Sequence, residues 1–217
     1  MKLSLCATAL TGALAMAGVA CAQTDAPVGK QAGTFMVRAR VIDVIPENNS
    51  SSTSVGGKVS ASSQLAPEVD FSYFFTDHIA AELIAATTEH RISAKGTAVG
   101  DVPVGKTWVL PPTLLAQYHF MPHQRFSPYV GVGLNATFFY SASAAKPTVT
   151  HVSLSNAVGP ALQAGFDYNF SGHWFANVDV KQIFLNTKAH VDTVLGPVSA
   201  KTNLDPLVVG VGVGYRF

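Results

Sequence analysis

Several of the few charged residues in this chain recur at alternate positions within otherwise apolar segments. Lysine, arginine, aspartate and glutamate make up only 12% of the residues. Eight of them share the polar side of such segments: Arg38, Arg40, Glu68, Asp70, Glu82, Asp167, Asp179 and Arg216. Buried charged groups need partners, and arginines opposite carboxylates supply them. We expect an internal ion-pair network that plugs the protein; a transport or proton-relay role is the alternative.

Motifs that would support enzymatic chemistry do not occur in the sequence. It contains neither a Gly-x-Ser-x-Gly nucleophile elbow nor a His-Glu-x-x-His metal motif. His119 and His123 are four residues apart, but on a strand that runs into a turn this spacing does not converge on a metal. We therefore expect no enzyme, no cofactor and no metal. A hydrolase at the expected loops would need histidines, of which the loops hold three: His90, His151 and His190.

The first 22 residues have the composition of a cleaved signal peptide. A positive start at Lys2 precedes the uncharged apolar stretch Leu3–Val19, and small residues follow at Ala20-Cys21-Ala22. We expect a signal peptide at 1–22 and a mature domain at 23–217. A transmembrane anchor and a lipoprotein site at Cys21 are the alternatives.

Cleavage would change both the thiol content and the charge of the chain. Both cysteines, Cys6 and Cys21, lie in the leader, so the mature chain would offer no disulfide and no thiol nucleophile. The formal net charge of +1 becomes zero when Lys2 is removed. A neutral domain gives no indication of a nucleic-acid partner.

The mature chain predicts strands rather than membrane helices. After the leader, no apolar run approaches the roughly 20 residues that a transmembrane helix needs. Apolar and polar residues alternate instead, which is typical of strands with one apolar face. Eight segments show this alternation: Phe35–Val44, Leu65–Phe75, Ile79–Thr88, Val109–Phe120, Tyr129–Phe139, Ala161–Phe170, Phe175–Leu185 and Leu207–Phe217.

The connections between these segments alternate strictly between long and short. The long ones are Pro46–Ser63, His90–Lys106, Ser141–Asn156 and Thr187–Asn203. The short ones are Thr76–His78, Met121–Arg125 and Ser171–His173. Outer membrane barrels place long loops outside and short turns in the periplasm. The sequence therefore predicts an all-β fold, an eight-stranded antiparallel transmembrane up-and-down barrel with both termini in the periplasm.

Aromatic residues gather at the two ends of the predicted strands. Tyr73, Phe120 and Phe170 fall near the short turns, whereas Trp108 and Tyr140 fall near the long loops. Two such bands match the two interfaces of a bilayer. A soluble sandwich or a lipocalin-like barrel, with these rings inside, is the alternative.

Several stretches resemble the outer membrane protein W family. They follow one another in the same order over about Gly33 to Phe217: Gly33–Ala39, Tyr73–Thr87, Leu110–Phe120, Tyr129–Asn135, Gly165–Tyr168, Leu204–Pro206 and Gly214–Phe217. The resemblance implies an eight-stranded barrel with a narrow channel, linked to the passage of small hydrophobic compounds across the outer membrane. It also implies a constriction formed on the third and seventh strands, which indicates Ile84 and Lys181.

The width of an eight-stranded barrel limits what it can do. Its interior is filled by side chains or holds one small ligand, so a general porin is not expected. Inward apolar positions give the candidate pocket residues Ile84, Leu115, Phe139 and Ile183. A solute would enter at the loops, be held in this apolar pocket, and leave sideways into the bilayer because the charged plug blocks the direct path.

Two other functions stay open. The loops could bind host, phage or envelope partners without transport, or the protein could be an unrecognised membrane enzyme. The expected partners are outer membrane lipid, a small hydrophobic solute and the barrel-assembly machinery, which would recognise the last strand ending at Phe217. We expect a monomer in the cell outer membrane.

Overall fold

The described chain is built from β-strands. The computed structural model describes residues 29–47, 52–53, 58–97, 100–147, 149–193 and 196–217. Within these ranges, no helix is long and apolar enough to cross a membrane. The predicted signal peptide at 1–22 lies outside the described residues.

Eight of the strands close into a ring in which every neighbour is antiparallel. They are β1 (Phe35–Ile45), β4 (Gln64–Phe74), β5 (Ile79–Ala86), β8 (Thr113–His119), β9 (Phe126–Ala144), β11 (Ala157–Ser171), β12 (Trp174–Ile183) and β15 (Leu207–Arg216). The ring closes where β15 pairs with β1, with Arg40 opposite Gly212. The predicted eight-stranded barrel is confirmed.

The sequence predicted loops for the long connections, but their described residues contain further strands that continue the barrel. They contain β2 (Ser52–Thr53), β3 (Lys58–Ala61), β6 (Thr88–Thr97), β7 (Gly100–Leu110), β10 (Val149–Leu154), β13 (Asn186–Thr193) and β14 (Gly196–Asn203). Antiparallel pairing satisfies the backbone of these polar segments whatever their side chains are. Because apolar and polar residues alternate poorly in these segments, the sequence pattern did not reveal them as strands.

The predicted strand Val109–Phe120 is interrupted near its start. β7 ends at Leu110 and β8 begins at Thr113, with Pro111 and Pro112 between them. Proline has no backbone N–H and cannot donate to a sheet. The hydrogen-bond ladder that joins this segment to β5 and β6 stops at the two prolines. It resumes without a change of register, since Ile84 pairs with Thr113 and Thr88 with Val109.

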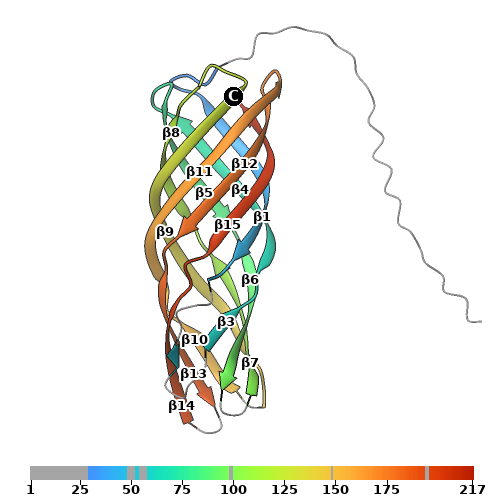
Figure 1. Ribbon diagram of the computed structural model, residues 1–217, viewed down its shortest axis with the longest axis vertical. Helices are drawn as coiled ribbons and strands as arrows, with labels where there is room; N and C mark the ends of the chain where they lie inside the picture. The colour runs from blue at the N-terminus through green and yellow to red at the C-terminus, as the bar shows by residue number, and fades with distance from the viewer. Residues whose placement is uncertain (1–28, 48–51, 54–57, 98–99, 148, 194–195) are drawn as a thin grey trace, which may run out of the picture.

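Figure 1 shows a tall barrel whose two ends differ. The chain end near Phe217 and the short turns lie at one end, here called the short-turn end. The strands β3, β7, β10, β13 and β14 reach the opposite end, here called the hairpin end.

The outer face of the barrel wall is apolar and exposed. It carries large side chains such as Leu65, Val132 and Val158. Exposed aromatic rings form one band near the short turns: Tyr73, Phe75, Tyr118, Phe120, Phe126, Tyr168, Phe170, Trp174 and Phe217. A second band lies toward the hairpin end: Trp108, Phe138, Tyr140 and Phe184. A soluble barrel would bury this surface, whereas a membrane barrel turns it to lipid.

The inward side chains form layers along the barrel axis. On β5 and β6 the buried inward positions read Ala80, Glu82, Ile84, Ala86, Thr88, His90 and Ile92. On β12 and the start of β13 they read Phe175, Asn177, Asp179, Lys181, Ile183, Leu185 and Thr187. From the short-turn end toward the hairpin end, both sets of inward side chains begin with apolar groups. Charged groups, further apolar groups and uncharged polar groups follow. Strand alternation repeated around the ring produces these layers.

Glycines on the last strand make room for the charged layer. A Cβ placed on Gly212 would lie 2.1 Å from the carbonyl oxygen of Ala39 and 2.8 Å from Cγ of Arg40. A Cβ on Gly214 would lie 2.3 Å from the ring of Phe175. The inward glycines of β15 thus accommodate the large side chains that fill the lumen.

Candidate functional site

Eight charged side chains meet in the lumen, and we call this cluster the charge layer. Its members come from β1, β4, β5, β11 and β12: Arg38, Arg40, Glu68, Asp70, Glu82, Asp167, Asp179 and Lys181. All of them are buried. Seven of the residues that the sequence placed in an internal network therefore lie together.

Arg38 joins carboxylates from three strands. Its Nη1 donates to Asp70 Oδ1 at 2.7 Å and to Glu82 Oε1 at 3.2 Å. Its Nε and Nη2 donate to the two oxygens of Asp167 at 3.3 and 3.1 Å. The planar guanidinium thus holds one carboxylate in a bidentate pair and links two more.

Arg40 forms the second hub, closer to the hairpin end. Its Nε lies 2.9 Å from Glu68 Oε1, and its Nη2 donates to Glu82 Oε1 at 2.9 Å. Its Nη1 lies 3.4 Å from Asp179 Oδ2, and Nη2 also contacts Asp70. Both arginines therefore share Glu82 and Asp70, so that the layer is one connected network.

Lys181 belongs to the charge layer and not to an apolar pocket. Its Nζ donates to Asp179 Oδ1 at 2.6 Å and to Glu68 Oε1 at 3.0 Å. The resemblance indicated Lys181 at the constriction; its long side chain reaches the carboxylates of the charge layer instead of packing with the candidate pocket residues. Arg216, in turn, is separate from the cluster and donates to the carbonyl oxygen of Gly172 at 3.3 Å.

Neutral side chains complete the hydrogen bonding of the charge layer. Gln117 and Gln163 donate to Glu82 Oε2 at 2.9 and 2.7 Å. Tyr129 donates to Asp179 Oδ2 at 2.8 Å, and Asn177 donates to Asp167 Oδ1 at 2.8 Å. An ion cluster away from water is stable only when its remaining lone pairs and protons are satisfied in this way.

A lysine that precedes the first strand enters the lumen from the short-turn end. Lys30 Nζ donates to Asp167 Oδ2 at 2.7 Å, to Ser127 Oγ at 2.8 Å and to His119 Nδ1 at 3.0 Å. Burial lowers the pKa of Lys30 to about 8, a decrease that its pairing with Asp167 partly offsets. Lys30 therefore covers the charge layer on the side that faces the short-turn end.

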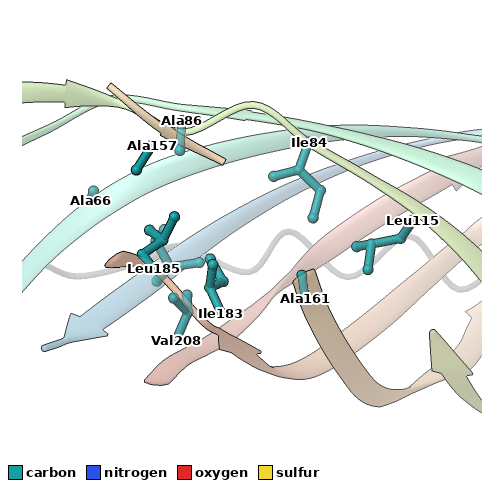
Figure 2. Packing of buried hydrophobic residues seen from close by; sticks show 10 residues of the cluster. Ala66, Ile84, Ala86, Leu115, Ala157, Ala161, Ile183, Leu185 and Val208 are labelled. Carbon is teal, nitrogen blue, oxygen red and sulfur yellow. The ribbon is translucent and has the colours of Figure 1, made fainter. Parts of the chain in front are cut away.

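An apolar layer rests directly on the charge layer on its hairpin side. Ten buried residues form it: Ile42, Ala66, Ile84, Ala86, Leu115, Ala157, Ala161, Ile183, Leu185 and Val208. Figure 2 shows Ile84, Leu115 and Ile183 projecting from different strands, with the four alanines lining the rest. Three of the four predicted pocket residues meet here. Phe139, the fourth, is only half-buried and lies higher, opposite Val109.

The histidines considered for catalysis or metal binding are dispersed. His119 is buried and donates from Nε2 to Gln117, whereas His123 is exposed and lies 3.2 Å from Asp77. His90 is buried in β6, and His151 is exposed on β10. In the described ranges, no three histidine, cysteine, aspartate or glutamate side chains come together as a metal site would require.

Similar proteins give the family of this chain. It is 47% identical to an uncharacterized outer-membrane protein, y4mB, of Sinorhizobium fredii, over 98% of this chain and 96% of that protein. It is 32% identical to outer membrane protein W of Vibrio cholerae over the whole length of both. The OmpW family model matches residues 31–217. The chain belongs to the OmpW family.

Solved barrels agree with this assignment. The crystal structure of OprG from Pseudomonas aeruginosa superposes with a TM-score of 0.82 at 30% identity, covering 87% of this chain and 98% of OprG. The solution structure of Escherichia coli outer membrane protein W gives 0.59 at 32% identity, covering 86% and 99%. This member of the OmpW family is therefore an outer membrane barrel, and its exposed apolar wall faces lipid.

Sequence reasoning missed two parts of the OmpW-family lumen. Lys30 lies before the first alternating segment, where no pattern signals an inward position. A set of buried uncharged polar residues lies above the apolar layer and is here called the collar: Thr88, His90, Thr107, Thr113, Asn135, Thr137 and Thr187. Extending the alternation of β5 through residues 88 and 90 would have indicated its first two members.

Proposed function

We propose that this protein is a passive channel for small hydrophobic molecules across the outer membrane, with no enzymatic activity and with both termini in the periplasm. One observation carries the proposal: an apolar layer inside the barrel ends directly on a sealed charge layer. Ile84 and Glu82 are two residues apart on β5, yet one packs among apolar side chains and the other among charges. An apolar solute gains by entering the first environment and not the second.

The charge layer acts as a plug in this scheme. Arg38 and Arg40 tie together four of the surrounding strands, and Lys30 covers the network on the periplasmic side. Moving a neutral solute through it would break several charge-assisted hydrogen bonds at once. The solute therefore leaves the apolar layer sideways, through the wall and into the bilayer.

The wall has a break at the height of the apolar layer. The register places Pro111 and Pro112 opposite Ala86 and Ala85 of β5. Pro111 faces β5 and cannot donate a ladder hydrogen bond to Ala86, and the alanine side chains offer little steric resistance. We assign the lateral exit to this gap between β5 and the β7–β8 junction.

A pair of tryptophan substitutions at adjacent positions tests the channel. Leu115→Trp fills the apolar layer and should abolish protein-dependent uptake of a small apolar compound such as octane. Leu114→Trp places the same ring on the lipid-facing side, where Leu114 is 58% exposed, and should leave uptake unchanged. Uptake would be compared with that of cells lacking the protein. Equal uptake with and without it would refute transport and favour a structural or partner-binding role.

We further propose that the barrel-assembly machinery recognises β15 and that the protein functions as a monomer. Phe217 ends the chain on the lipid side, and its N–H donates to the carbonyl oxygen of Phe35 at 2.8 Å. Its ring lies 6.0 Å from that of Phe35, across the seam of the barrel. Removing Phe217 should slow insertion into membranes in cells more than refolding into pure lipid, which measures only the seam.

A further inference from the structure

The collar is unexpected in a channel for purely apolar molecules. It lies between the apolar layer and a second apolar cluster near the hairpin end, formed by Ile92, Val104, Val149 and Val152. Burying uncharged polar groups between two apolar regions is costly unless they are hydrogen-bonded. A continuous apolar lining would need no such hydrogen bonds. The polarity of the collar therefore calls for a functional explanation.

In the lower part of the collar, every polar hydrogen is already used. Asn135 Nδ2 donates to Thr113 Oγ1 at 2.8 Å and to the carbonyl oxygen of Pro111 at 3.1 Å. Thr113 donates to the same carbonyl oxygen at 3.1 Å. Thr137 donates to Asn135 Oδ1 at 2.6 Å.

The upper part shows the same arrangement. His90 Nδ1 lies 2.9 Å from the carbonyl oxygen of Ser62, which can only accept, so Nδ1 carries the proton. With Nδ1 as the donor, Nε2 is the acceptor nitrogen of the neutral ring and accepts from Thr88 Oγ1 at 2.9 Å. Thr187 donates to the carbonyl oxygen of Ser155 at 2.7 Å, and the Thr107 hydroxyl is shared between the carbonyl oxygens of Trp108 at 3.3 Å and Tyr140 at 3.4 Å.

What the collar has left is acceptor capacity. A threonine hydroxyl has one hydrogen and two lone pairs. The hydroxyl oxygens of Thr107, Thr137 and Thr187 accept no hydrogen bond from any described residue. No lysine or arginine is among the seven described residues of the collar. A solute that moves between its side chains meets lone pairs and no available donor.

We propose that the collar is a specificity filter that favours hydrophobic molecules carrying a hydrogen-bond donor, such as primary alcohols, over molecules that can only accept. This inference rests on the proposed channel function and names its solute class. A hydroxyl donates to a threonine oxygen as it passes and recovers the hydrogen bond it loses on leaving water. A ketone cannot, and a carboxylate also meets repulsion from the lone pairs. One net hydrogen bond corresponds to roughly a three- to tenfold preference.

Four solutes of equal chain length test the filter. Cells with and without the protein are exposed to octane, 1-octanol, 2-octanone or octanoate, and initial uptake is measured by gas chromatography. The protein-dependent rate for 1-octanol should exceed that for 2-octanone about three- to tenfold, and octanoate should gain nothing. Equal protein-dependent rates for the alcohol and the ketone would overturn the filter while leaving the channel intact. No protein-dependent uptake of any of the four would instead refute the channel.

Isosteric variants assign the preference to the collar. Thr107→Val and Thr187→Val together remove two acceptor oxygens and should bring the ratio of alcohol to ketone close to that set by the rest of the lumen. The matching double variant with Thr107→Ser and Thr187→Ser keeps both hydroxyls and should keep the ratio of the unsubstituted protein. Thr150→Val makes the same chemical change at an exposed residue of β10 and should have no effect. A ratio unchanged in the double valine variant, shown to be folded by its heat-modifiable migration, would count against the collar.

Discussion

Lys30 and Asp167 are 137 residues apart in sequence, yet Nζ of one lies 2.7 Å from Oδ2 of the other inside the barrel. The lysine comes from the segment before β1, and the aspartate from β11. Asp167 is also held by Arg38 and Asn177. The short N-terminal segment is thereby fastened to the wall on the far side of the lumen.

Replacing this lysine should weaken the barrel. Lys30→Met keeps the length of the side chain but removes three hydrogen bonds to buried groups, so we expect a loss of about 1–3 kcal/mol in the free energy of unfolding. Chemical unfolding in lipid vesicles measures it. Lys106→Met is the control, because the Lys106 side chain is 51% exposed beside Glu89 and should change stability by under about 0.5 kcal/mol. Equal effects would show that the buried contacts of Lys30 contribute nothing.

Two glycines of β15 should differ sharply in their tolerance of a methyl group. Gly212→Ala brings a Cβ against backbone, the carbonyl oxygen of Ala39 at 2.1 Å. Gly210→Ala brings its Cβ to 3.0 Å from the side-chain methyl Cγ2 of Ile42, and the nearest backbone atom, the carbonyl oxygen of Val41, is 3.8 Å away. We expect the first to be destabilised by at least about 1–3 kcal/mol more than the second. The folded fraction after refolding into vesicles decides between them, and equal fractions would contradict the tight seam.

The proline gap should control exit from the channel. Replacing both Pro111 and Pro112 by alanine restores two backbone N–H donors. The donor at 112 faces β9, where the carbonyl oxygen of Pro112 already accepts from Ala136 at 2.9 Å. The donor at 111 faces β5, so the ladder between β5 and the β7–β8 junction can close there. Octane uptake should fall severalfold while stability rises by about 1 kcal/mol. Pro67→Ala on β4, opposite Val41, is the control in another wall and should leave uptake unchanged. Undiminished uptake in the double variant would place the exit elsewhere.

A polar residue on the lipid-facing wall should prove stabilising. Gln182 interrupts the apolar face of β12, and its Nε2 donates to the carbonyl oxygen of Asp205 at 2.8 Å. Asp205 has a φ of 25°, and its side chain accepts from the N–H of Leu185 at 2.8 Å. Gln182→Leu should therefore cost about 1 kcal/mol in vesicle unfolding, although leucine suits lipid better. A gain in stability would show that the Gln182 amide destabilises the protein on its lipid-facing side.

The sequence predicted the parts of this barrel that alternation controls. Arg38 and Arg40 on β1, or Glu68 and Asp70 on β4, are two residues apart and must share a face, so their convergence followed once the strands were recognised. Ile84, Leu115 and Ile183 were found in the same way. The alternation of long and short connections supplied the strand number.

Other parts depend on distance in three dimensions and could not be predicted. Alternation gives the face of a residue but not its height on the barrel. The pattern therefore did not show that Lys181 contacts the carboxylates of the charge layer, or that Phe139 lies opposite Val109, away from Ile84, Leu115 and Ile183. Lys30 precedes every strand, and only the folded barrel shows that its side chain turns inward. The hairpins of the long connections were missed because backbone pairing, rather than side-chain pattern, forms them.

The charge layer also bears on how the barrel is assembled. Its partners come from five strands, and no two adjacent strands contain the complete set. A half-formed sheet inserted in lipid would hold unpaired arginines and carboxylates, a state that the hydrocarbon strongly disfavours. Insertion and closure should then occur as a single cooperative event, in which a strand placed in the wrong register leaves a charge unmatched. The charge layer therefore favours the correct strand register, because only that register gives every charged side chain a partner.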